Sequence, residues 1–226
     1  MRLAIIVPVY NEAATVVEIV RRLLSVPLDA EIVLVDDGST DGTAEILGRI
    51  SHPRLKVIRH ETNMGKGAAI ATGIRAVTAD AIVIQDADLE YNPEELPRLL
   101  EPVEHGEADV VYGSRFLGRM ENMRLANYLA NTILTWTANI LYGARITDEA
   151  TCYKLLRADL LKSIPLACKR FEFCPEVTAR VRRRGVPIRE LPITYLGRTK
   201  NAGKKIGLWD AWTAFLTLLK YRFGPA

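Results

Sequence analysis

Three acidic residues, Asp86, Asp88 and Glu90, alternate with other residues directly after the apolar run 81–84. Residues two apart at the end of a strand point to the same side, so these carboxylates can converge on one hard divalent cation. Close carboxylates also repel one another unless a cation or a ligand lies between them. Ordinary surface loops produce the same spacing, but the position after a buried strand favours a metal site.

A second acidic segment, 36–43 (DDGSTDGT), follows the apolar run 31–35. Carboxylates at this position can accept hydrogen bonds from ribose hydroxyls or from the N–H groups of a base. The same residues also fit a turn followed by a helix N-cap at Thr40 or Asp41. The sequence leaves both interpretations open.

The segment 63–67 (NMGKG) opens a predicted helix. Its glycines would let an anion approach backbone N–H donors while Lys66 supplies charge, although an ordinary helix start has the same residues. The segment lacks the G-x-x-x-x-G-K-[ST] pattern of a P-loop, which excludes an ordinary ATPase. The segment 8–12 (PVYNE) lacks G-x-G-x-x-G, which excludes the common dinucleotide fold.

Short apolar runs alternate with amphipathic segments through the first half of the chain. This alternation predicts an α/β fold with a mainly parallel sheet, helices on both faces and ligands at the carboxyl ends of the strands. The second half departs from this rhythm, yet we expect both halves to share one sheet in a single domain, 1–226. The predicted strands cover residues 3–9, 31–35, 55–58, 81–84, 109–112 and 188–195, and the predicted helices cover 12–24, 41–50, 65–77, 93–103, 124–142, 175–184 and 208–222.

The formal charge of +3 on this chain of 226 residues conceals an asymmetry. Residues 1–113 hold 10 Lys and Arg against 19 Asp and Glu, a difference of −9, whereas residues 114–226 hold 20 against 8, a difference of +12. Such asymmetry indicates two kinds of partner, or merely two solvated faces, and a basic half suits phosphate, nucleic acid or anionic membrane. Arg180 and the arginines at 182–184 lack an aromatic platform, so no nucleic-acid partner is expected.

Taken together, these segments resemble the family 2 glycosyltransferases, inverting nucleotide-sugar enzymes with a single GT-A domain. The second half resembles the branch that acts on polyprenyl phosphate, which includes the dolichyl-phosphate mannose synthases. In the first half the resemblance rests on segments 8–12 (PVYNE), 35–43 (VDDGSTDGT), 63–67 (NMGKG), 86–94 (DADLEYNPE) and 113–115 (GSR). In the second half it rests on 147–154 (TDEATCYK), 171–173 (FEF), 190–193 (ELPI), Arg198 and 203–206 (GKKI).

The resemblance implies a Rossmann-like GT-A domain in which residues 1–113 bind the nucleotide sugar and the metal, and residues 114–226 bind the acceptor. It implies Mg²⁺ or Mn²⁺ at Asp86, Asp88 and Glu90, although Gln is frequent in this branch at the position of Glu90. The residues expected to contact the nucleotide sugar are Pro8, Tyr10, Glu12, Asp37, Lys66 and Asp86. Those expected around the donor and acceptor phosphates are Arg115, Arg124 and Arg198, and the expected catalytic residues are Asp88, Asp148 and Arg115.

Such a transferase must stabilise the departing diphosphate while a nucleophile attacks the anomeric carbon, and a metal ion with arginines suits this task. A lipid monophosphate acceptor is already ionised near neutral pH, because the second pKa of a phosphate group is about 6. A sugar hydroxyl would instead need a base, for which Asp148 is the candidate by its position in the family motif.

The resulting prediction is transfer of a hexose from a donor of the GDP-mannose or UDP-glucose type to polyprenyl (dolichyl) phosphate. Two alternatives stay open. In one, the acceptor is a saccharide or glycolipid hydroxyl and Asp148 is the base. In the other, the chain is a non-catalytic subunit that holds a nucleotide sugar or a membrane complex.

Two apolar segments in the basic half suggest contact with a membrane. Leu125, Leu129, Ile133, Trp136 and Ile140 follow helical spacing, and segment 206–223 carries aromatic residues with Lys or Arg at both ends, as interfacial helices do. A core helix, or a patch that binds a membrane subunit, would have the same pattern. No stretch matches the roughly 20 mainly apolar residues of a membrane span. The three cysteines fit reduced thiols, so we expect a cytoplasmic, peripherally membrane-associated protein.

Overall fold

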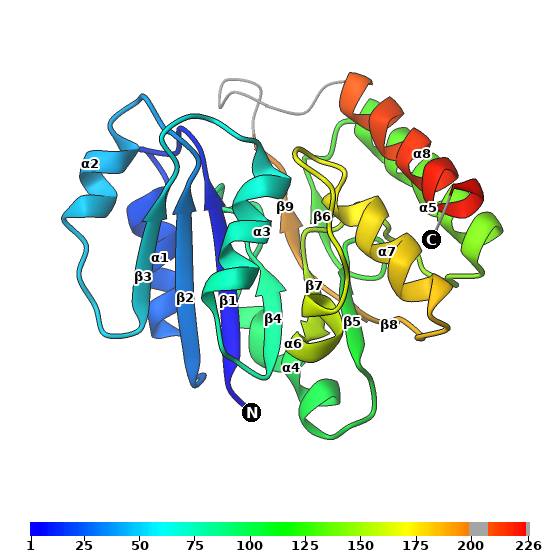
Figure 1. Cartoon of the computed structure of the whole chain (residues 1–226), viewed down its shortest axis with the longest axis horizontal. Coiled ribbons are helices and arrows are strands. Elements are labelled where there is room, and N and C mark those ends of the chain that lie inside the picture. The colour runs from blue at the N-terminus through cyan, green and yellow to red at the C-terminus, as the bar shows by residue number, and fades with distance from the viewer. Residues whose placement is uncertain (199–207, 225–226) are drawn as a thin grey trace.

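The computed structural model describes residues 1–198 and 208–224 and has an α/β architecture built on a seven-stranded sheet (Figure 1). The strand order is β3-β2-β1-β4-β7-β5-β8, so both halves of the chain contribute to the sheet, as predicted. The strands are β1 (Leu3–Val9), β2 (Ala30–Asp36), β3 (Leu55–Arg59), β4 (Ala81–Ile84), β5 (Val110–Ser114), β7 (Lys154–Arg157) and β8 (Arg189–Pro192).

The middle of the sheet is parallel and buried. β1 pairs in parallel with β2 on one side and with β4 on the other, so that Ile5 lies between Ile32 and Val83. These strands are continuous apolar runs because a parallel sheet is covered on both faces. The mainly parallel arrangement is confirmed, with one exception: β7 is antiparallel to both of its neighbours, β4 and β5.

The helices of the first half are α1 (Val16–Ser25), α2 (Thr43–Gly48), α3 (Lys66–Ala76) and α4 (Leu96–Glu104), the last preceded by the 3₁₀ turn η1 (Pro93–Glu95). Two of them begin later than predicted. The chain turns before α1, where the backbone N–H groups of Thr15 and Val16 both donate to Glu12 O. Before α2, the carboxylate of Asp41 accepts the backbone N–H groups of Thr43 and Ala13 and so holds the loop against the α1 entry.

The second half adds helices beside the sheet and a small second sheet. The helices are α5 (Leu125–Tyr142), α6 (Ala158–Lys162), α7 (Phe173–Arg183) and α8 (Leu208–Phe223), and β6 (Met120–Glu121) pairs with β9 (Tyr195–Leu196). α8 packs on α5 and α7 at the end of the molecule away from β3 (Figure 1). The strand predicted at 188–195 is divided, because β8 ends at Pro192 and β9 begins at Tyr195.

The apolar stripe of α5 faces outward instead of packing into the core. Its five side chains, from Leu125 to Ile140, are between 53% and 81% exposed. α8 has two faces: Trp209 and Phe223 are each 77% exposed, whereas Leu218 and Tyr221 are buried. No helix within the described residues is long and apolar enough to cross a bilayer. The predicted motif 203–206 lies outside the described residues.

Candidate active site

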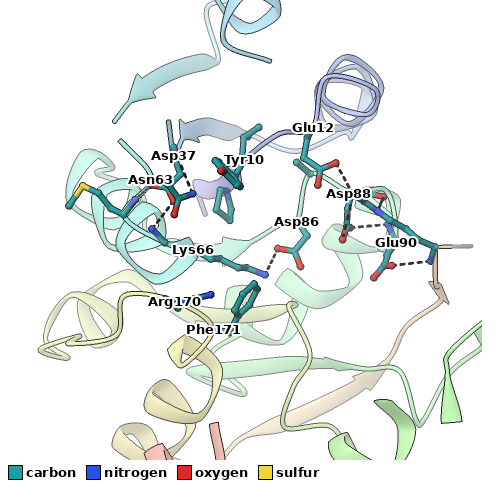
Figure 2. A pocket seen from close by; sticks show the side chains of 16 residues that line it. Tyr10, Glu12, Asp37, Asn63, Lys66, Asp86, Asp88, Glu90, Arg170 and Phe171 are labelled. Carbon is teal, nitrogen blue, oxygen red and sulfur yellow. Dashed lines mark hydrogen bonds and ion pairs between the residues drawn. The ribbon is translucent and has the colours of Figure 1, made fainter. Parts of the chain in front are cut away.

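A cavity of about 510 Å³ opens at the carboxyl ends of β1, β2 and β4 (Figure 2). The strand order reverses between β1 and β4, which is where α/β sheets bind their ligands. All six residues predicted to contact a nucleotide sugar line this first cavity, together with Asp88, Glu90 and Arg198. Asn63, Met64, Arg170 and Phe171 line it as well.

Asp37 is buried in the wall of this cavity, and its carboxylate holds the neighbouring turn. One oxygen accepts the backbone N–H of Met64 at 2.9 Å, and the other accepts that of Gly65 at 2.7 Å. Nδ1 of His60 lies 2.8 Å from the first oxygen. Asp37 therefore fixes the turn that leads into α3.

Two N–H groups at the start of α3 are bonded within the chain, which favours the ordinary helix start over an anion site at the glycine-rich segment. Gly67 N–H donates to the carbonyl of Arg170 at 2.8 Å, and Ala68 N–H donates to that of Lys169 at 3.0 Å. The glycine at 65 is needed because its φ is +98° and a Cβ there would lie 2.3 Å from the Lys169 carbonyl oxygen. The carbonyls of residues 169 and 170 thus take two of the N–H groups at this helix start.

The side chain of Lys66 points into the cavity, where its Nζ lies 2.5 Å from the carboxylate of Asp86 (Figure 2). Burial lowers the pKa of Lys66, but the charge of Asp86 outweighs burial and raises this pKa above its ordinary value. The charges of Lys66 and Asp86 therefore neutralise each other when no ligand is bound.

Glu12, Asp88 and Glu90 lie at the opposite side of the cavity (Figure 2), and Arg198 joins them in a charged network. Arg198 donates to the Glu12 carboxylate at 2.7 Å and lies 3.8 Å from that of Asp88. Glu90 accepts the Tyr195 hydroxyl at 2.7 Å and the backbone N–H of Arg198 at 2.9 Å. Burial, together with the charges of Asp86 and Glu90, raises the pKa of Asp88 to about 7 despite the opposing effect of Arg198.

The donor atoms here suit a hard divalent cation, because Asp86 and Asp88 carry close carboxylates whose repulsion a cation would relieve. The predicted ligand set of three is not assembled, however, since Asp86 points to Lys66 and Glu90 is bonded to Tyr195 and Arg198. Between residues 1–198 and within 208–224, no three His, Cys, Asp or Glu side chains are grouped to hold a metal ion. Asp86 and Asp88 fit the ion once Asp86 separates from Lys66.

A second cavity of about 410 Å³ adjoins the first one. Its wall comes from α5, the start of α7 and α8, and it is largely apolar, with small side chains such as Ala126, Ala130 and Ala214. Arg115 and Arg124 are the cations in the part of its wall away from the first cavity. Cys152 and Cys174 are free thiols in this wall, which agrees with the expectation of reduced cysteines. The residues shared by both cavities are Lys66, Asp86, Asp88, Glu90, Arg170 and Phe171.

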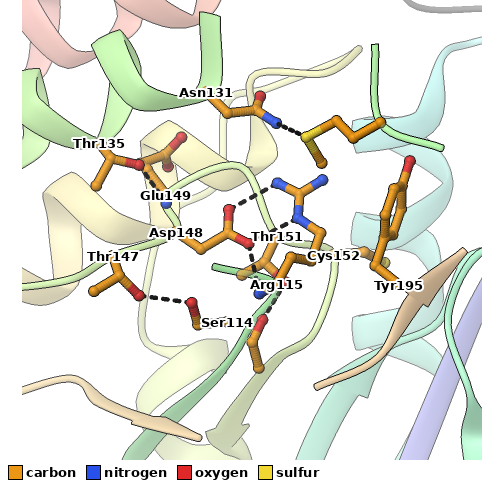
Figure 3. A network of polar contacts seen from close by, with 12 residues as sticks. Ser114, Arg115, Asn131, Thr135, Thr147, Asp148, Glu149, Thr151, Cys152 and Tyr195 are labelled. Atoms are coloured by element: carbon orange, nitrogen blue, oxygen red, sulfur yellow. Dashed lines mark hydrogen bonds and ion pairs between the residues drawn. The ribbon is translucent and has the colours of Figure 1, made fainter. Parts of the chain in front are cut away.

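Arg115 and Asp148 form a buried bidentate ion pair beneath the second cavity (Figure 3). Nε and one terminal nitrogen of Arg115 each donate to a different Asp148 oxygen at 2.7 Å, and the backbone N–H of Arg115 adds a third bond at 3.0 Å. Burial lowers the pKa of Arg115, but Asp148 outweighs this effect and the pKa lies well above its ordinary value. The guanidinium is therefore a fixed positive charge, and it lies 5.3 Å from the Tyr195 ring centre.

Asp148 has a position that does not suit a general base. Its side chain is 0% exposed, both of its oxygens are bonded to Arg115, and it lines neither cavity. Glu190 holds the preceding backbone by accepting the N–H groups of Thr147 and Asp148. In this geometry Asp148 holds the Arg115 guanidinium, which suits a positioning role better than the predicted role of a catalytic base.

The family model "Glycosyl transferase family 2" matches residues 4–164 of the chain. The chain belongs to this family. Its membership makes it a glycosyltransferase and bears out the resemblance seen in the sequence motifs.

Two relatives of this glycosyltransferase carry names from the polyprenyl-phosphate branch, which confirms the resemblance to that branch. Undecaprenyl-phosphate mannosyltransferase of Micrococcus luteus is 33% identical over 224 residues, which cover 92% of this chain and 90% of that protein. Dolichol-phosphate mannosyltransferase of Pyrococcus furiosus is 29% identical over 218 residues, which cover 91% of this chain and 61% of that protein.

Solved structures confirm the GT-A fold of this glycosyltransferase. Glucosyl-3-phosphoglycerate synthase from Mycobacterium tuberculosis, in complex with Mn²⁺, UDP and glucosyl-3-phosphoglycerate, aligns with a TM-score of 0.72 at 20% sequence identity. The alignment covers 99% of this chain and 81% of that one. A complex of the same enzyme with Mg²⁺ and UDP aligns with a TM-score of 0.73 at 21% identity, covering 99% of this chain and 80% of that one.

Four of the first-half motifs, 8–12, 35–43, 63–67 and 86–94, meet around the first cavity, and Arg170, from outside every motif, lines it as well. Arg170 and Phe171 enter from the loop before α7, whereas Tyr195, from β9, lines the second cavity and is bonded to Glu90. Phe171 belongs to the motif 171–173, which signalled the family branch and not a cavity wall. Arg170 had no signal, because an isolated arginine in an irregular loop has neither periodicity nor spacing.

Proposed function

We propose that this glycosyltransferase moves a hexose from a nucleoside-diphosphate sugar to the phosphate of a polyprenyl phosphate at a membrane surface. The observation that carries the proposal is the pair of adjoining cavities, one lined by many charged side chains and one largely apolar, with Arg115 and Arg124 in the apolar one. The names of the relatives, undecaprenyl-phosphate and dolichol-phosphate mannosyltransferase, support the same acceptor class.

The first cavity is the proposed donor site. Pro8, Tyr10 and Glu12 would contact the nucleoside, and Asp37 would help to shape the site through the turn 63–65 that it holds. Lys66 would bind the diphosphate and Asp86 would contact the nucleotide sugar once the two separate from each other. The UDP complexes of glucosyl-3-phosphoglycerate synthase, which has the same fold, support a nucleotide at this position.

Asp86 and Asp88 would hold a divalent cation, Mg²⁺ or Mn²⁺, beside the diphosphate. The cation would neutralise the negative charge that develops on the departing diphosphate. Glu90, the third predicted ligand, is engaged with Tyr195 and Arg198, so we assign it to holding Arg198 near the phosphates. The Mn²⁺ and Mg²⁺ complexes of the structural neighbour support this metal class.

The second cavity is the proposed acceptor site, where residues 114–226 contribute most of the wall. Its apolar wall suits the first isoprene units of the lipid, and Arg115 and Arg124 would bind the phosphate headgroup. Because Asp148 orients Arg115 by a bidentate pair, the guanidinium keeps a free edge for a phosphate oxygen without a change of rotamer.

In the proposed reaction, an ionised oxygen of the lipid phosphate attacks the anomeric carbon from the side opposite the nucleotide. A carbon–oxygen bond forms to the acceptor, the bond to the nucleoside diphosphate breaks, and the configuration inverts. No proton has to be removed, because the phosphate is already ionised near neutral pH. Arg198 and Lys66 would stabilise the departing diphosphate, and Arg115 would orient the acceptor.

The outward apolar residues of α5 and α8 support peripheral binding to a membrane. Exposed leucine, isoleucine and tryptophan side chains on two adjoining helices form a patch that water does not favour. The same two helices line the proposed acceptor cavity through Ala130 and Ala214. A lipid headgroup could therefore reach the cavity while its chain stays in the bilayer.

The test is a transfer assay with purified protein, Mn²⁺, labelled UDP- and GDP-sugars, and vesicles that contain polyprenyl phosphate. Label should enter the organic extract with at least one donor, and EDTA should abolish this transfer. Label that appears only on a free saccharide or glycolipid would instead support a hydroxyl acceptor.

A further inference from the structure

Arg170 lies where the two cavities meet, and its charge is not neutralised. Lys66, at the same junction, is paired with Asp86 at 2.5 Å. Arg170 is exposed, and across residues 1–198 and 208–224 its guanidinium has no hydrogen bond or ion pair. Figure 2 shows it beside Phe171, on the same side of the cavity as Lys66. The junction therefore carries a positive charge that no carboxylate of the described residues pairs with.

The backbone beneath Arg170 is held from both sides. Its carbonyl accepts Gly67 N–H at 2.8 Å, and its own N–H donates to the Glu172 carboxylate at 2.8 Å. The buried carboxylate of Glu176 accepts the N–H groups of Ala167 at 2.9 Å and Cys168 at 2.7 Å. The anchored backbone therefore keeps the Cα of Arg170 beside the junction of the two cavities.

Phosphate chemistry explains a free guanidinium at this point. In the proposed function, on which this step rests, the diphosphate of the donor and the phosphate of the acceptor must approach each other where the cavities join. A guanidinium binds phosphate oxygens through two parallel N–H donors and stays charged throughout. We infer that Arg170 binds a phosphate oxygen at the junction, from either the nucleoside diphosphate or the lipid phosphate.

The neighbouring residue provides a matched control. Lys169 is also exposed and also precedes α7, but it lines neither cavity. Arg170→Gln and Lys169→Gln each remove one positive charge from the same loop, so a general effect of net charge would be equal in both variants. Only a phosphate contact distinguishes them.

The experiment measures the binding of UDP, GDP, uridine and guanosine by calorimetry with Mn²⁺, and the KM for polyprenyl phosphate in the transfer assay. Whichever of UDP and GDP binds wild type, Arg170→Gln should raise its Kd by about tenfold, or else raise the KM for the acceptor by about tenfold. Loss of a charge-assisted hydrogen bond has an effect of this size. The first result assigns the contact to the donor and the second to the lipid. Nucleoside affinity should be unchanged, and Lys169→Gln should stay within about twofold of wild type.

Three results would overturn the inference: wild-type values for Arg170→Gln in both assays, equal losses in both variants, or an equal loss for the nucleoside. The proposed function is tested separately, by nucleotide binding and glycosyl transfer of the wild-type protein. If wild type binds UDP or GDP but does not glycosylate polyprenyl phosphate, the proposed acceptor is wrong while the diphosphate arm still decides on Arg170. If wild type binds neither diphosphate, both ideas fail together.

Discussion

The hydroxyl of Tyr221 on α8 donates a 2.7 Å hydrogen bond to the buried carboxylate of Glu176 on α7. Arg180 donates to the same carboxylate at 2.9 Å, and its guanidinium carbon lies 4.4 Å from the centre of the Tyr221 ring. Since Glu176 also binds the backbone of Ala167 and Cys168, it joins α8 to the loop that carries Arg170. The outward-facing helix and the wall of the donor cavity are thus connected through one side chain.

Tyr221→Phe tests this connection. The change removes one donor from a buried carboxylate, which is expected to lower the free energy of unfolding by about 1–3 kcal/mol. Urea denaturation measures this, and hydrogen exchange of the Ala167 and Cys168 amides should become faster. Tyr128→Phe, on the exposed side of α5, is the control and should change stability by less than about 0.5 kcal/mol.

Glu176 should also give stability a specific dependence on pH. Burial raises its pKa, but bonds from Tyr221, the loop backbone and Arg180 outweigh burial, and the pKa lies below its ordinary value of 4.5. A lowered folded-state pKa stabilises the protein above the unfolded value, and this stability is lost as the pH falls through the folded value. The difference in unfolding free energy between wild type and Glu176→Gln should therefore be largest at about pH 6 and shrink below about pH 4.5. A difference that grows on acidification would contradict this assignment.

Asp148→Asn separates a positioning role from a base role. The variant leaves the Arg115 charge buried without its partner, so we expect a loss of about 3–5 kcal/mol in unfolding free energy together with weaker transfer. Asp159→Asn breaks the exposed pair with Arg157 and should cost at most about 1 kcal/mol. Unchanged stability of Asp148→Asn with abolished transfer would restore the base interpretation.

Asp88→Asn and Glu90→Gln should differ in their response to metal. Asp88→Asn is expected to remove Mn²⁺-dependent transfer, because it halves the pair of carboxylates that fits the ion. Glu90→Gln keeps one oxygen to accept the Arg198 N–H, and its amide NH2 group can donate to the Tyr195 hydroxyl, so it should retain activity within about tenfold of wild type. Titration of both variants with Mn²⁺, followed by transfer, makes the comparison. Equal loss in both would return Glu90 to the ligand set.

The outward residues of α5 and α8 should determine binding to vesicles. Replacing Trp136, Ile140 and Trp209 by Glu together is expected to reduce sedimentation with anionic vesicles at least about tenfold, since each buried apolar side chain contributes about 1.5–3 kcal/mol. Thermal stability should hardly change, because these side chains are exposed. Val17→Glu with Val57→Glu, at positions 55% and 39% exposed on other elements, is the control. Equal loss in this control would indicate a general charge effect.

The elements that the sequence predicted well are those with strong periodicity. The buried strands β1, β2 and β4 and the long helix α5 lie within a few residues of their predicted ranges, because continuous apolar runs and helical spacing are local signals. The helices α1 and α2 begin later, because Thr15 N–H closes a tight turn on Glu12 O before α1, and the Asp41 side chain takes the Thr43 N–H before α2.

The candidate site could be predicted residue by residue where a motif follows a strand, as at Asp37, Asp86 and Asp88. Three features depend on contacts between distant segments and have no local signal. They are the hydrogen bonds from the start of α3 to the carbonyls of residues 169 and 170, the Arg115–Asp148 pair, and the bond between Glu90 and Tyr195. Helical spacing located the α5 stripe, but only the packing of α7 and α8 decides which face stays exposed.

The position of β7 has a consequence for how the chain acquires its structure. This strand, from the second half, separates β4 from β5, and β5 pairs with no strand of the first half. During synthesis, the apolar edge of β4 must therefore wait for a strand that emerges much later, and pairings of this sequence separation slow folding. A truncated chain made of the acidic half alone would expose that edge to other molecules, so aggregation rather than autonomous folding is its expected fate.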